Sequence, residues 1–83
     1  MSALGELIEA LRLVEERLDQ ARGQLAAGRR EFDATRAALA RLDPEHPENV
    51  VPPGFARADD QLERTQELIE HVQELLRTFA SRL

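Results

Sequence analysis

The sequence has no cysteine, no tryptophan and no tyrosine, and only three phenylalanines among its 83 residues. Without cysteine the chain can form neither disulfide bonds nor thiolate metal sites. So few aromatic rings offer little on which nucleic-acid bases could stack, and the net charge of −5 repels phosphate backbones. We therefore expect no nucleic-acid partner, and we expect so short a chain to gain stability by self-association or from another protein.

Long apolar runs are also missing. No segment approaches the roughly 18 to 20 apolar residues that a membrane span needs. Charged residues interrupt the N-terminal segment at Glu6, Glu9 and Arg12, so this segment does not resemble a signal peptide. The sequence predicts a cytoplasmic protein with no membrane partner, and it leaves export without a leader peptide open.

Two stretches of the sequence contain apolar or small residues at alternating steps of three and four. This heptad spacing keeps one face of a helix turned toward a partner helix along its length. The first stretch comprises Leu4, Leu7, Leu11, Val14, Leu18, Ala21, Leu25, Gly28, Phe32, Thr35, Leu39 and Leu42. The second comprises Phe55, Ala58, Leu62, Thr65, Ile69, Val72, Leu76, Phe79 and Leu83.

All four prolines lie between these stretches, in the segment LDPEHPENVVPPGF. Proline disfavours helix in the residue before it, so Pro44 ends the first helix, and Pro53 fits the first position of the second. We predict an all-α antiparallel two-helix hairpin, a single domain over residues 1–83. Its parts are a helix at 2–42, a loop at 43–52 and a helix at 53–82. Three residues of this segment, Val50, Val51 and Phe55, are expected to fold over Leu39 and Leu42.

The hairpin hypothesis predicts which residues lie at the same level, namely those whose numbers add up to about 97. In this register most small residues of the first helix meet large ones of the second. Gly28, for example, would make room for Ile69. Small residues facing large ones are what dense packing between helices requires.

Three arginines at seven-residue intervals form a row along one flank, which we expect to be polar and exposed. The predicted register sets Arg22, Arg29 and Arg36 opposite Gln73, Gln66 and Asp59, respectively. An acidic residue stands three positions before both Arg22 and Arg36. This spacing favours pairs within the helix over a binding site for an acidic protein surface.

The opposite flank and one end of the hairpin carry leucines that the hairpin alone would leave exposed. Leu68 and Leu75 lie just beside the apolar row of the second helix. The first helix is also longer by roughly 15 Å, so its first turns would extend beyond the second. Grouped exposed leucines mark contact surfaces. We therefore predict a protein interface formed by Leu4, Leu7, Ile8, Leu11, Leu68 and Leu75. Two hairpins joined there would form a four-helix bundle, so the expected partner is a second copy or another helical protein.

Residue patterns typical of catalysis or ligand binding are not found. Glu67, His71 and Glu74 share a helical face, but that face points outward, whereas metal ligands of helical bundles point inward. No histidine shares a face with Thr35 or Thr65, so no pair of nucleophile and base can be drawn. We predict no catalytic, cofactor-binding or metal-binding residues, no small-molecule substrate and no enzymatic activity.

The segment VVPPGFARADDQLERTQELIEHVQELLRTFASRL at residues 50–83 resembles the C-terminal half of small uncharacterised actinobacterial proteins. In these, a Val-Pro-Pro step leads into an amphipathic helix that begins RADxxLER. The resemblance covers the loop and second helix, and it implies no particular activity. In shape the hairpin is also similar to the WXG100-type proteins of type VII secretion, which pair into four-helix bundles. The Trp-Xaa-Gly turn and the tyrosine-containing export signal of those proteins are absent here.

Together these features predict a non-enzymatic assembly or adaptor module that works through protein–protein contacts and self-association. One alternative is a small partner or chaperone associated with type VII secretion. The other is an antitoxin-like or regulatory protein that binds an effector through the overhanging end or the arginine row.

Overall fold

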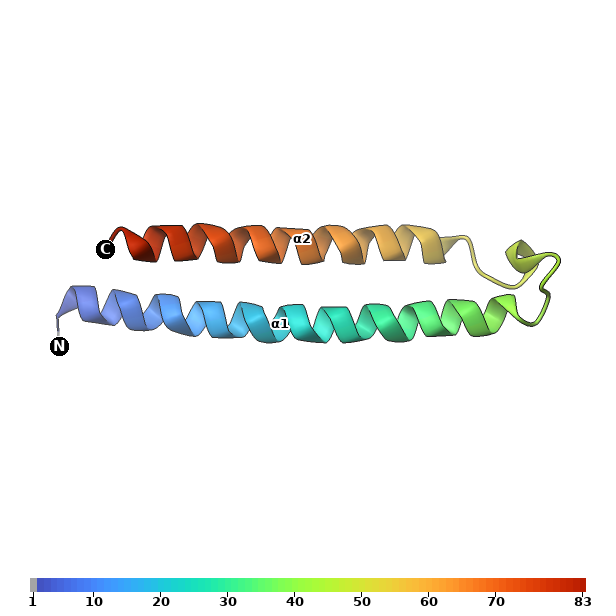
Figure 1. Cartoon of the computed structure of the whole chain (residues 1–83), viewed down its shortest axis with the longest axis horizontal. Helices are drawn as coiled ribbons and strands as arrows, with labels where there is room; N and C mark the ends of the chain where they lie inside the picture. Colours follow the sequence, from blue (N-terminus) through green and yellow to red (C-terminus); the bar gives the residue numbers. More distant parts are fainter. Residues whose placement is uncertain (1) are drawn as a thin grey trace.

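The structure is a computed structural model that describes residues 2–83, and it shows two long antiparallel helices joined by a loop (Figure 1). Helix α1 spans Ala3–Ala40, the 3-10 helix η1 spans Pro47–Asn49 and helix α2 spans Gly54–Ser81. The predicted all-α helical hairpin is confirmed. The molecule measures 64 × 15 × 15 Å, and its radius of gyration is 19.0 Å. A compact chain of this length would have a radius of gyration of about 12 Å, so this hairpin is a thin rod.

Local hydrogen bonds explain where α1 begins and ends. Ser2 is its N-cap, because the Ser2 Oγ accepts a hydrogen bond from the Gly5 N–H at 3.0 Å. At the other end, the Leu42 N–H donates to the Leu39 carbonyl at 3.0 Å, which tightens the last turn. The regular helix therefore ends at Ala40, two residues before the predicted end.

The loop is held by short-range hydrogen bonds and by its prolines. The His46 N–H donates to the Asp43 Oδ1 at 3.2 Å, a turn that the short polar side chain of aspartate favours. Pro53 has helical dihedral angles and is the N-cap of α2, which begins one residue later than predicted. The prolines thus lie between the two helices, as the sequence predicts.

The tip of the hairpin packs differently from the prediction. Phe55 stacks on Phe32, with ring centroids 4.5 Å apart, and does not cover Leu42. Leu42 is 74 % exposed, because it lies in the turn beyond the end of the regular helix. Val50 and Val51 are half-buried. The loop therefore covers the end of α1 only up to Ala40.

Side-chain contacts between α1 and α2 define the register, and the predicted value of about 97 is wrong. The numbers of the paired residues add up to 87, 88, 92 and 95, around 90. The pairs are Phe32–Phe55, Arg29–Asp59 at 3.7 Å, Glu15–Arg77 at 3.9 Å and Arg29–Gln66 at 2.9 Å. The predicted pair Arg29–Gln66 is therefore confirmed, whereas the other three sums fall below 97. The difference is one heptad. An apolar row with a seven-residue period sets small residues against large ones equally well after a shift of seven, so this criterion could not distinguish the two registers.

Gly28 does not make room for a bulky residue, contrary to the prediction. A Cβ atom added at Gly28 would find no neighbour within 4 Å, and the same holds for Gly23. Both residues are exposed. In the observed register Gly28 lies level with Leu62, yet the side of α1 that carries it is turned away from α2.

The pattern of burial shows which sides of the helices meet. We letter the heptad a to g so that the apolar rows alternate between a and d; on the helix surface, e lies beside a, and g lies beside d. Most a positions are half-buried, namely Leu11, Leu18, Leu25, Phe32, Leu39, Phe55, Leu62, Ile69 and Leu76. Most e positions are half-buried or buried, namely Glu15, Arg22, Arg29, Asp59, Gln66 and Gln73. The two helices therefore pack along their a and e positions.

The d and g positions of both helices are mostly exposed and form one open side of the hairpin, the d/g face. Its exposed d residues include Leu7, Val14, Gly28, Thr35, Thr65 and Phe79. Its exposed g residues include Ala10, Arg17, Gln24, Glu31, Leu68 and Leu75. Within residues 2–83 no apolar residue is fully buried, and Gln73, 2 % exposed, is the only buried residue.

Alanine at Gly28 or at Gly23 should stabilise the hairpin by about 0.5 to 1 kcal/mol each, because glycine is costly inside a helix and the added methyl group meets no neighbour. Chemical denaturation at a fixed chain concentration measures the effect. Gly5→Ala is the control, since its Cβ would lie 3.2 Å from the Ser2 Oγ and disturb the cap. A loss of stability in Gly28→Ala would show that its surroundings are not open.

The register can be tested by two double-mutant cycles that share Asp59. Arg29 and Asp59 are largely covered, with side chains 26 % and 23 % exposed, so Arg29→Ala and Asp59→Ala should couple by about 0.5 to 1 kcal/mol. Arg36→Ala and Asp59→Ala should be additive within about 0.3 kcal/mol. If Asp59 instead couples to Arg36 and not to Arg29, the register of about 97 is correct.

Candidate functional site

Large apolar side chains are exposed mainly at one end of the hairpin, where the two termini lie (Figure 1). Within residues 2–83 ten such side chains are exposed, and nine of them lie in residues 4–14 or 68–83. These nine are Leu4, Leu7, Ile8, Leu13, Val14, Leu68, Leu75, Phe79 and Leu83. Leu42 at the loop is the tenth. We call the half of the hairpin that carries the nine residues the terminal half, and the other the tip half.

The predicted interface residues lie in this terminal half. Leu68 and Leu75 are 61 % and 55 % exposed, and both occupy g positions of the d/g face. Leu4, Leu7 and Ile8 are exposed near the start of α1, which extends beyond the end of α2 (Figure 1). The structure thus places five of the six predicted residues, all exposed, between the middle of the rod, where Leu68 lies, and the end that carries the termini.

Leu11 was predicted to lie in the part of the first helix that extends beyond the second, and it does not. It is half-buried, and with Ile8 it lines a hollow that Ala80 of α2 also lines. The reason is the register: a shift of one heptad moves the end of α2 seven residues closer to the start of α1. The unmatched part of α1 is correspondingly shorter than the sequence predicted.

Leu13, Val14 and Phe79 are exposed residues that the sequence analysis did not assign to the interface. Val14 and Phe79 belong to the apolar rows and were assigned to the contact between α1 and α2. The width of the apolar stripe in the sequence could have indicated that these residues are exposed. Where a, d and g are all apolar, the stripe is wider than a single neighbouring helix covers.

The prediction of an exposed arginine flank holds for Arg36, which is exposed, but is wrong for Arg29, which lies on the side where the helices meet. Arg29 donates to the Gln66 Oε1 at 2.9 Å and lies 3.7 Å from Asp59, and these contacts draw the e positions of the two helices together. Gln73, which was assigned to this exposed flank, is the buried residue. The predicted pairs within α1 are confirmed, since Arg22–Asp19 measures 2.8 Å and Arg36–Asp33 measures 3.4 Å.

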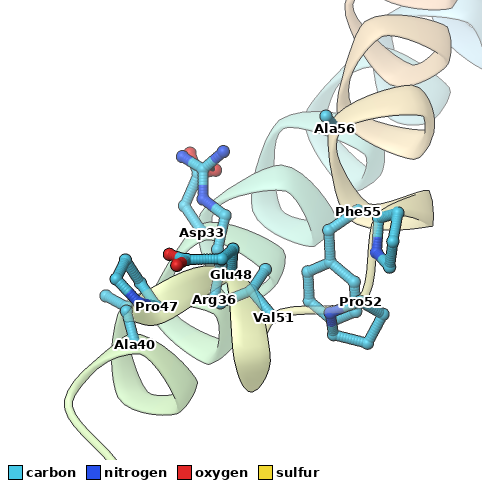
Figure 2. A pocket seen from close by; sticks show the side chains of 11 residues that line it. Asp33, Arg36, Ala40, Pro47, Glu48, Val51, Pro52, Phe55 and Ala56 are labelled. Atoms are coloured by element: carbon cyan, nitrogen blue, oxygen red, sulfur yellow. Dashed lines mark ion pairs between the residues drawn. The ribbon is translucent and has the colours of Figure 1, made fainter. Parts of the chain in front are cut away.

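An open hollow of about 440 Å³ lies between the end of α1, the loop and the start of α2. Figure 2 shows Phe55 and Pro52 on one side of it, the charged side chains of Asp33, Arg36 and Glu48 on another, and Val51 between them. Arg36 already pairs with Asp33. This hollow is the strongest alternative site, with a mainly apolar wall and a charged rim that is partly self-paired.

The side chains considered as nucleophiles or metal ligands lie apart from one another. The Thr35 and Thr65 hydroxyls donate to the carbonyls of Glu31 and Gln61 in the preceding turn, at 3.0 and 2.8 Å. Within residues 2–83 no group of three or more His, Asp or Glu side chains is placed to hold a metal ion.

No helix in the part of the chain that the structure describes is long and apolar enough to cross a membrane. Comparisons with protein-family models, with curated proteins and with solved structures found no match to this chain. The d/g face and its exposed leucines are therefore interpreted on their physical properties alone.

Proposed function

We propose that this chain is a non-enzymatic helical assembly module that associates with a second copy of itself through the terminal half of its d/g face. One observation carries the proposal: within residues 2–83 no apolar residue is fully buried, while nine large apolar side chains are exposed in the terminal half, five of them on the d/g face. Exposed apolar residues grouped in this way are typical of a protein contact surface.

The total exposed surface supports the same proposal. The chain exposes 6453 Å², whereas a compact monomer of 9.4 kDa exposes roughly 5,000 Å². The excess of about 1,400 Å² exceeds the roughly 800 Å² that each partner contributes to a standard protein interface. Each chain can therefore bury a standard interface against a second copy and still expose more surface than a compact monomer of the same mass.

The position of the charged residues favours this face over the arginine row. Arg22, Arg29 and Arg36 are engaged by Asp19, by Asp59 with Gln66, and by Asp33. An effector bound there would have to replace these contacts. On the d/g face, Leu68 and Leu75 have no such contacts to break, so burying them against another apolar surface is favourable.

Sedimentation equilibrium of the chain at micromolar concentration tests the proposal. We expect a mass of about 19 kDa, twice the 9.4 kDa of one chain. Leu68→Glu combined with Leu75→Glu should weaken association at least about a hundredfold, because two carboxylates would lose their hydration in the interface.

Leu42→Glu is the matched control. Leu42 is the large exposed apolar residue outside the terminal half, so its replacement by the same charge should leave the association constant unchanged. Circular dichroism should show that all variants remain helical. A wild-type chain that stays at 9.4 kDa would refute self-association, and a dimer that survives the Leu68 and Leu75 pair would show that another face is used.

A further inference from the structure

The d/g face is not uniform along its length. In the terminal half its large apolar residues are Leu7, Val14, Leu68, Val72, Leu75 and Phe79, and all but Val72 are exposed. Its charged residues there are Arg17 and Arg82, at g positions. In the tip half the same heptad positions hold Gln24, Glu31, Thr35, Ala58, Gln61 and Thr65. The surface that can exclude water therefore covers only about half of the rod.

We propose that two copies pack tail to tail, antiparallel about a twofold axis that crosses the d/g face near Val14 and Leu75, so that only their terminal halves overlap. This arrangement rests on the proposed self-association and specifies its geometry. In the observed register Leu75 lies level with about residue 15 of α1, close to Val14. Val14 and Leu75 therefore mark the middle of the apolar surface.

The axis position sets the length of the overlap. A twofold axis at Val14 brings the start of α1, at Ala3, level with position 25 of the second copy. At 1.5 Å per residue the overlap is about 33 Å. Two rods of 64 Å that share this length form a particle about 95 Å long. The two loops then lie at its opposite ends.

The overlap matches the area that a stable dimer needs. Two helices side by side are about 20 Å wide, so the contact measures about 33 by 20 Å, or roughly 700 Å² per chain before surface relief is counted. This value is close to the 800 Å² per partner of a standard interface.

The same symmetry also covers the end of α1 that α2 leaves bare. Leu4 and Leu7 lie at the end of the rod, beyond or beside the last turn of α2, and both are exposed. The twofold axis brings Leu68 of the second copy to their level. A single operation thus covers both the overhanging leucines and the leucines of the d/g face.

Full side-by-side packing is disfavoured by the tip half. It would press Glu31 and Gln61, which lie outside the tail-to-tail overlap, against a second copy of the same surface. Burying a carboxylate without a partner is costly, and a parallel arrangement would in addition place the two Glu31 side chains near each other.

Small-angle X-ray scattering of the full chain, at a concentration where sedimentation gives the dimer, tests the arrangement. We expect a maximum dimension of about 95 Å. A dimer whose maximum dimension stays near the 64 Å of one hairpin would overturn tail-to-tail packing while leaving self-association intact. A monomer at every concentration would instead overturn the proposed function.

Spin labels give an independent test, because the chain has no cysteine and single labelling sites can be introduced cleanly. Labels at Glu16→Cys, on the outer side of the terminal half, should lie about 20 to 30 Å apart in the dimer. Labels at Glu48→Cys, in the loop, should lie roughly 90 Å apart and give no short distance. Tip labels within about 30 Å, or Glu16 labels without a short distance, would overturn the proposal.

Discussion

A helix covers only part of the circumference of the helix beside it, and this limit governs the structure. Both helices carry apolar residues at a and d, and α2 also carries Leu68 and Leu75 at g, a stripe wider than one neighbour can cover. Contact along a and e leaves the a residues half-buried and the d/g face open. The thin shape of the molecule, the absence of a buried apolar residue within residues 2–83 and the exposure of Leu68 and Leu75 all follow from that limit.

Polar residues at the e positions link the two helices in the observed register. A hydrogen bond needs its partner within a few ångströms, so these contacts hold the helices at a defined level. The Arg29 guanidinium donates to Gln66 and lies 3.7 Å from Asp59, so it contacts two e positions of α2 that are one heptad apart. A shift of one heptad would set Arg36 opposite Asp59 instead, because the arginine row has the same seven-residue period as the apolar rows.

The helices and their bounds could be predicted from the sequence because heptad spacing and proline act locally. The start of α1, next to Ser2, and the start of α2, next to Pro53, agree with the predictions within a residue. The end of α1 moved by two residues because its last turn tightens at Leu42. Such details depend on a few hydrogen bonds, which apolar spacing does not reveal.

The register and the choice of packed side could not be predicted in the same way. Gly28 can face Ile69 or Leu62 with equal ease, so pairing small residues with large ones did not distinguish the two alternatives. The sequence also offered two flanks for the contact between the helices, and they pack on the e side, where Arg29 lies 3.7 Å from Asp59. Leu68 and Leu75 were predicted correctly as exposed, because a g position becomes open when the e side is packed.

Thermal unfolding as a function of chain concentration tests most directly whether a second copy covers the d/g face. If folding and dimerisation are linked, the midpoint of unfolding rises with concentration, by about 4 °C for each tenfold increase in a dimer of this size. Followed by circular dichroism at 222 nm, from low to high micromolar chain concentration, the midpoint should show this rise. A midpoint that stays constant over a hundredfold range would contradict it and would mean that the open hairpin is stable alone.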